Sequence, residues 1–139
     1  MNAMKMSKDG YLLLLHTDEW WNGLGREELE KYVAQSQAWL ERLMASGKVK
    51  GGQALARNGA MVSGQNGHSI TDGPFAESKE VIGGYLLLDV ETFEEAVAIA
   101  KTVPGLALGR KVEVRPLTNV CPAEARLEEL KREEELATA

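Results

Sequence analysis

Short apolar runs and one alternating stretch mark the strands that this chain can form. Tyr11–Leu15 and Tyr85–Leu88 are apolar at every position, which is typical of strands that are covered on both faces or lie centrally in a sheet. Lys111–Leu117 alternates instead, so that Val112 and Val114 share one face while Lys111, Glu113 and Arg115 share the other. This last stretch predicts a half-solvated strand, ended by a proline.

Two segments have the three- and four-residue spacing of amphipathic helices. The first runs from Arg26 to Gly47, and this glycine is a typical helix end. Its apolar stripe consists of Leu29, Tyr32, Val33, Leu40, Leu43 and Met44. The second helix begins at Thr92, which forms a capping box with Glu95, and ends at Pro104.

A hairpin is predicted between the two helices. Asn66-Gly67 supplies two residues that accept positive φ, as a type I′ turn requires. A two-residue loop would place Met61 opposite Asp72. His68 would then lie about 13 Å from Asp72 along one strand. These two residues are therefore not expected to form a pair.

Two further segments have weaker patterns. Val49–Ala56 predicts a short strand, interrupted by Gly51-Gly52, where another backbone or a ligand can approach closely. Pro122–Ala139 predicts a charged helix with few apolar residues, so it can bury little surface. We expect this helix to pack loosely on the body or to reach a partner subunit.

The stretch from Thr71 to Lys79 is the least generic part of the chain. In Asp72-Gly73-Pro74 the aspartate can accept backbone hydrogen bonds, the glycine is permissive and the proline is stiff, so a sharp corner is expected. Phe75 would then enter the core. A charged, rigid loop is typical of a functional site. The alternative is a plain connector in which Asp72 caps its own turn.

The run from Asp72 to Glu80, followed by Gly83-Gly84-Tyr85, closely resembles the signature of the DGPF proteins in the YCII-related family. A weaker resemblance extends from Tyr11 to about Leu117. It implies a ferredoxin-like α+β fold of βαββαβ order that dimerises in the manner of a dimeric α/β barrel. It also implies bacterial relatives, mostly of unknown function, that are often encoded beside alternative sigma factors.

The predicted elements agree with this plan, with an inserted β-hairpin and a C-terminal helix added. We therefore expect three parts: residues 1–9 outside the fold as a disordered segment or tag remnant, residues 10–120 as the DGPF domain, and residues 121–139 as a charged tail. A chain of 139 residues fits a single domain of this kind.

Composition excludes several classes of function. A net charge of −5 argues against a nucleic-acid-binding surface. One cysteine and two histidines exclude an intrachain disulfide and a zinc-type ligand set. The apolar runs are far below the ~20 residues of a membrane helix. We expect a cytoplasmic protein that binds no membrane, metal or cofactor. No phosphate loop, metal motif or nucleophile elbow is present, which removes several classes of enzyme.

The candidate catalytic pair is Asp72 with His16, because a carboxylate can orient and charge-stabilise an imidazole near neutral pH. Four of the candidate ligand-binding residues come from the corner, namely Gly73, Pro74, Phe75 and Lys79. Trp20 could cover a pocket or a dimer contact, or simply close the core edge.

Ser36 completes this set because of the resemblance. Enzymes among the relatives are thought to pair a helix histidine with an aspartate, and an ungapped alignment from Gly47 places that histidine at Ser36. No histidine lies between Arg26 and Gly47, which weakens the transfer of that chemistry.

Three functions follow. The first is a homodimeric small-molecule-binding protein or enzyme with a pocket near the corner. The second is a non-catalytic interaction module linked to a sigma factor, which the absent helix histidine and the acidic tail favour. The third is a cofactor-free monooxygenase, which shares only the expected architecture.

Overall fold

Four antiparallel strands form the main sheet. The computed structural model describes residues 9–17, 19–72 and 81–138. The strands follow the order β2-β5-β1-β6, and every neighbouring pair is antiparallel. Each predicted apolar or alternating segment lies in one of them, so these strand predictions are confirmed. Their bounds are Tyr11–Thr17 (β1), Val49–Ala54 (β2), Val81–Leu88 (β5) and Val112–Pro116 (β6).

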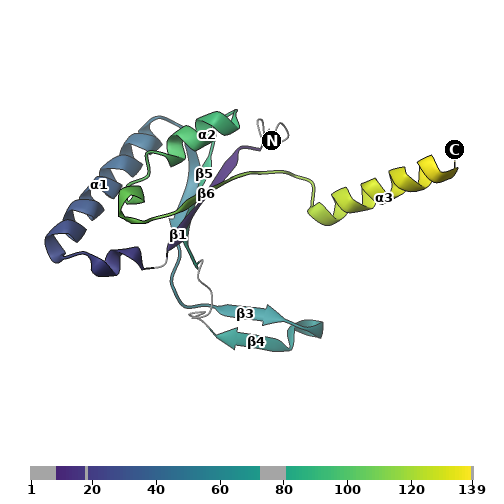
Figure 1. The fold of residues 1–139 in the computed structure, drawn as a ribbon, viewed down its shortest axis with the longest axis horizontal. Helices are drawn as coiled ribbons and strands as arrows, with labels where there is room; N and C mark the ends of the chain where they lie inside the picture. The colour runs from purple at the N-terminus through teal and green to yellow at the C-terminus, as the bar shows by residue number, and fades with distance from the viewer. Residues whose placement is uncertain (1–8, 18, 73–80, 139) are drawn as a thin grey trace.

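Two helices cover one face of this sheet (Figure 1). They are α1 (Arg26–Ala45) and α2 (Phe93–Ala100). The predicted cap of α2 is confirmed, since the Glu95 N–H donates to Thr92 Oγ1 at 3.1 Å. Together with the antiparallel sheet, the helices give a mixed α+β fold that is compatible with the ferredoxin-like plan.

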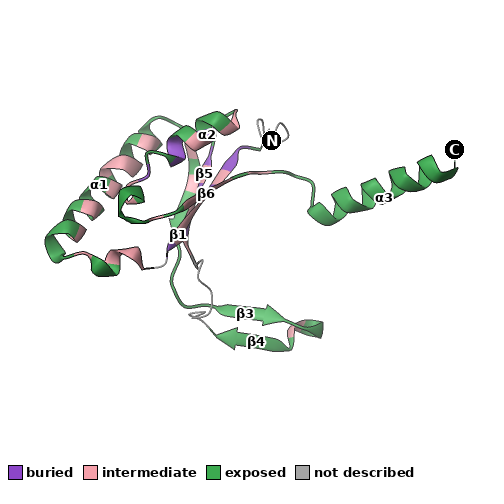
Figure 2. Ribbon diagram, in the orientation of Figure 1, coloured by how far each residue is buried: buried purple, intermediate pink, exposed green. Residues whose placement is uncertain are grey.

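The core lies between the sheet and the helices. Strand register places Leu13 of β1 opposite both Leu86 of β5 and Val114 of β6, so these side chains share the covered face. Burial follows the register, being greatest in the central strands and α2 (Figure 2). The buried residues are Tyr11, Leu13, Leu86, Leu88, Val90, Ala96, Ile99, Ala100 and Val103. α1 contributes Trp39, Leu40 and Leu43 from a stripe that is only half-buried.

The opposite face of the sheet carries no helix of the described chain. We call it the open face. It presents the alternate residues of the central strands, namely Leu12, Leu14, Tyr85 and Leu87, all half-buried. The solvated face of an antiparallel sheet is commonly polar, so partly exposed apolar residues on both central strands of this face are unusual for a monomer.

A separate two-stranded sheet projects from the body (Figure 1). It consists of β3 (Ala60–Ser63) and β4 (Ser69–Asp72), every residue of which is exposed. The predicted positive φ of Asn66 and Gly67 is confirmed. The predicted register is wrong, because a short 3₁₀ helix, η3 (Gln65–Gly67), lengthens the connection and pairs Met61 with Thr71 instead of Asp72.

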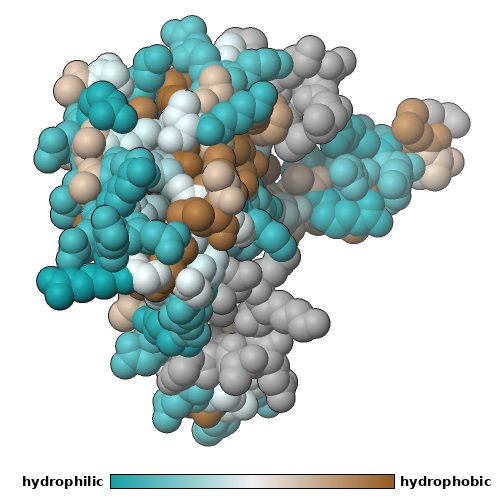
Figure 3. All heavy atoms as spheres, turned by 60° about the vertical axis from the view of Figure 1, so that its left-hand side comes forward, coloured by the Kyte–Doolittle hydropathy of each residue, from teal (hydrophilic) through white to brown (hydrophobic). Residues whose placement is uncertain are grey.

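The C-terminal helix α3 (Pro122–Thr138) stands away from the body. None of its residues is buried. Its surface is largely hydrophilic, with apolar atoms gathered at its far end (Figure 3). No helix of the described residues is long and apolar enough to span a membrane.

Candidate functional site

His16 lies at the end of β1, on the same side of the strand as Leu12 and Leu14. Its Nε2 atom is 3.0 Å from Oε1 of Glu113, which comes from the neighbouring strand β6. The His16 side chain is 14% exposed and that of Glu113 is 41% exposed. The imidazole is therefore held under the surface, while the carboxylate also reaches solvent.

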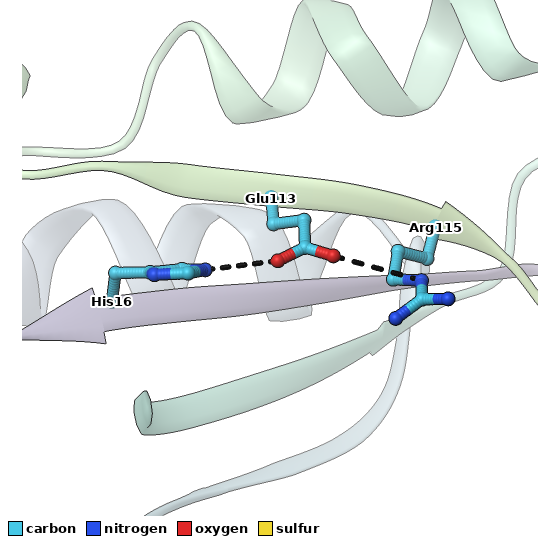
Figure 4. A network of polar contacts seen from close by, with 3 residues as sticks. All are labelled: His16, Glu113 and Arg115. Atoms are coloured by element: carbon cyan, nitrogen blue, oxygen red, sulfur yellow. Dashed lines mark hydrogen bonds and ion pairs between the residues drawn. The ribbon is translucent and has the colours of Figure 1, made fainter. Parts of the chain in front are cut away.

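Arg115 completes the cluster from the same strand. It lies two residues after Glu113 and so on the same face, with its Nε atom 3.6 Å from the other carboxylate oxygen. Figure 4 shows His16 and Arg115 pointing toward Glu113 from opposite sides. Both oxygens of Glu113 thus face a nitrogen donor. We call this group the His16–Glu113–Arg115 cluster.

The second ring nitrogen of His16 is the unusual feature of this cluster. Nδ1 is buried and has no hydrogen-bond partner among the described residues. A buried polar atom without a partner costs about 1–3 kcal/mol, and such atoms often mark catalytic sites or places where water or a ligand binds. The bond to Glu113 favours the proton on Nε2, which would leave a lone pair on Nδ1.

The structure does not join the predicted pair. Asp72 is the last residue of β4 and is exposed on the hairpin, and no hydrogen bond or ion pair links it to His16 within the described chain. His16 has Glu113 as its carboxylate partner instead. The alternation of the last strand predicts only that Glu113 and Arg115 lie on its solvated face. No local pattern predicts that Glu113 contacts His16.

The corner residues Gly73, Pro74, Phe75 and Lys79 lie outside the described residues. The strand that follows them is described, however. Val81 pairs with Thr17, and Ile82 pairs with His16. The chain therefore enters β5 at the His16 end of the sheet.

Trp20 and Ser36 lie elsewhere. Trp20 begins the 3₁₀ helix η2 (Trp20–Gly23), and its ring packs edge-on against Tyr32, with centroids 4.7 Å apart. Ser36 is on α1, one turn from Tyr32, and its Oγ is buried without a hydrogen-bond partner in the described part of the protein. Neither residue contributes to the His16–Glu113–Arg115 cluster.

Arg110 and Tyr32 form a second polar contact that the sequence did not reveal. Arg110 Nη1 donates to Tyr32 Oη at 2.8 Å and to the Pro104 carbonyl at 3.0 Å. Burial lowers the pKa of the Arg110 guanidinium below its ordinary value, and the contact with Tyr32 partly opposes this shift. These bonds tie the loop before β6 to α1, so the contact is structural.

An open groove of about 380 Å³ lies on the helix layer, beside the end of α2. Its walls are fixed by a hydrogen bond of 2.8 Å from Trp39 Nε1 to Thr102 Oγ1. The lining residues are Gln35, Ala38, Trp39, Arg42, Thr102 and Pro104. Across the described ranges, no group of three or more histidine, cysteine, aspartate or glutamate residues is arranged to hold a metal ion.

Comparison with known families identifies one match. A model of the YCII-related domain covers residues 10–118, which is most of the chain and includes every strand and the helices α1 and α2. No curated protein matched significantly. The match ends before α3, so this helix is an addition to the family domain.

Proposed function

We propose that this protein, which belongs to the YCII-related family, is a dimeric small-molecule-binding protein or enzyme. Its ligand site would include the His16–Glu113–Arg115 cluster, near the segment that leads into β5. The observation that carries this proposal is the buried, unpartnered Nδ1 of His16, held behind a solvent-reaching carboxylate.

The chemistry of the cluster suits a small anionic ligand that exchanges a proton. Glu113 can accept a hydrogen bond or a proton, and His16 orients it and can share that proton. Arg115 is 65% exposed and bound to Glu113 only at 3.6 Å, so its guanidinium can pair with a carboxylate or phosphate on the ligand.

The open face supports the dimer. A two-fold arrangement would place Leu12, Leu14 and Tyr85 of one copy against the same face of the other, covering apolar surface that is only partly buried in one copy. The His16–Glu113–Arg115 cluster lies on the same face of the sheet and borders this patch along β6, where Arg115 pairs with Leu12 and Glu113 pairs with Leu14. The ligand site would thus lie at the seam between two copies.

The test is a thermal-shift screen with small carboxylates and organic phosphates on three forms of the protein. A ligand at about 100 times its Kd stabilises the folded state by about 2.7 kcal/mol, a shift of several degrees in Tm. We expect a shift for the wild type that is lost in Glu113→Gln and in Arg115→Met. Glu129→Gln, which breaks an exposed ion pair on α3, is the control and should respond like the wild type.

The melting temperatures of the unliganded proteins also distinguish a structural role of Glu113 from a functional one. If Glu113→Gln alone lowers Tm by several degrees and no compound binds, the His16–Glu113 pair only fastens β6 to β1, and the site proposal fails. An unchanged or higher Tm is expected of a functional carboxylate, because functional sites are often held at a cost to stability.

The second candidate is a non-catalytic interaction module. Ser36 favours it, since this residue occupies the helix position where the resemblance places a catalytic histidine. The sigma-factor link and the monooxygenase chemistry remain predictions from resemblance and architecture. The absence of any ligand response in the screen, with a stable dimer, would favour the module.

A further inference from the structure

The helix α3 lacks the contacts that normally stabilise a helix. Isolated helices shorter than about 12–15 residues are marginal in water, and most of the stability of helices in proteins comes from packing an apolar face. α3 has 17 residues, none of them buried. Its ion pairs, such as Arg126–Glu129 at 3.0 Å and Lys131–Glu128 at 3.5 Å, contribute only a few tenths of a kcal/mol each.

One side of α3 is nevertheless suited to packing. Ala123, Leu127 and Leu130 follow the i, i+4, i+7 spacing of a single face. Leu127 is 51% exposed and Leu130 is 39% exposed, so this stripe faces solvent in a single copy. Leu136 is 78% exposed and lies off the stripe, at the end of the helix.

The position of α3 points to what covers the stripe. β6 ends in a fixed place, because the Leu117 N–H donates to the Gly10 carbonyl at 3.0 Å. Only residues 118–121 separate this anchor from α3. In Figure 1 α1 lies on one side of the sheet and α3 extends from the other, where the open face has no helix of its own.

We propose that α3 is an arm that packs its Leu127–Leu130 stripe on a second copy of this chain. The proposal rests on the dimer proposed above. A helix of this length spans about 25 Å, close to the width of a small domain, so it can cross much of a partner docked on the open face. The stripe is then covered in the dimer, and α3 adds apolar contact beyond the sheet-to-sheet interface.

The experiment is sedimentation equilibrium on the full-length protein, with Leu127→Gln/Leu130→Gln compared with Leu136→Gln. Glutamine keeps a high helix propensity, so the changes remove apolar surface without breaking the helix. Burying two leucines is worth enough that the double variant should raise the Kd of the dimer at least about tenfold. Leu136→Gln should leave it unchanged.

Two results would overturn the proposal, and they are distinguishable. A wild type that is monomeric at every concentration removes both the dimer and the arm. A dimer whose Kd is the same in the double variant removes the arm alone. If the double variant then also has a lower Tm at all protein concentrations, α3 packs on its own body.

Discussion

At the scale of single residues, Gly105 shows how the loop before β6 is fitted to the helix layer. Its φ is +100°, in the left-handed region that favours glycine, and a Cβ there would lie 3.0 Å from the Trp20 ring. Trp20 in turn packs edge-on against Tyr32, which accepts a hydrogen bond from Arg110. In the described structure Trp20 thus packs between Gly105 and Tyr32.

Gly105→Ala should destabilise the protein more than Gly109→Ala does. Both glycines have left-handed φ, but Gly109 has no heavy atom within 4 Å of its Cβ position. Each change costs about 1–3 kcal/mol of backbone strain, and Gly105→Ala adds the displacement of Trp20. Urea unfolding would measure both free energies. Equal losses would mean that Trp20 moves aside without cost.

The candidate site shows what residue-level prediction can and cannot reach. His16 was identified from its place at a strand exit, and Glu113 was placed correctly on the polar face of the last strand. Their contact could not be predicted, because the two residues are 97 positions apart and meet only through strand pairing. A spacing pattern contains no information about which strands become neighbours.

At the scale of elements, local sequence patterns predict where helices and strands lie, but they do not predict the register of the hairpin. The helix α2 begins at its predicted cap, and each of the four sheet strands lies where its pattern predicts. The hairpin register failed because the type I′ prediction assumed a two-residue loop. Residues 64–68 instead form a longer connection around η3, which shifts every pair by one position.

Thr92→Ala should lower the stability of the whole domain through α2. The change removes the acceptor for the Glu95 N–H at the start of the helix that supplies Ala96, Ile99 and Ala100 to the core. Loss of such a cap costs about 1 kcal/mol, or about 3–6 °C in Tm for a protein of this size. Thr92→Ser keeps an acceptor and should retain most of the stability. Identical melting of Thr92→Ala and the wild type would contradict the cap's contribution.

At the scale of the whole molecule, the two projections carry several of the exposed large apolar side chains, while the open face carries half-buried ones. The hairpin exposes Met61, Val62 and Ile70, each by more than half. A two-stranded hairpin is marginal by itself in water. Contiguous apolar surface of this kind often marks an interaction site, and α3 adds Leu127, Leu130 and Leu136 to the exposed apolar side chains.

Leu12→Glu should convert the proposed dimer into a monomer. A carboxylate among the half-buried apolar residues of the open face would lose its hydration when a second copy covers that face, and this desolvation opposes association. Size-exclusion chromatography with light scattering would measure the mass. Leu108→Glu, at a 44% exposed position outside the sheet, is the control. A Leu12→Glu protein that remains dimeric would place the interface elsewhere.

The pairing of β1 with β6 also sets the order in which the protein can mature. Strand β1 cannot complete its pairing until β6 has been synthesised, because Leu13 is paired with Val114. Proteins dominated by such distant pairings fold in milliseconds to seconds, more slowly than helical domains. His16 and Glu113 meet only when this pairing closes. A nascent or truncated chain that lacks β6 would thus have neither a complete sheet nor the cluster, and binding competence would appear together with the native fold.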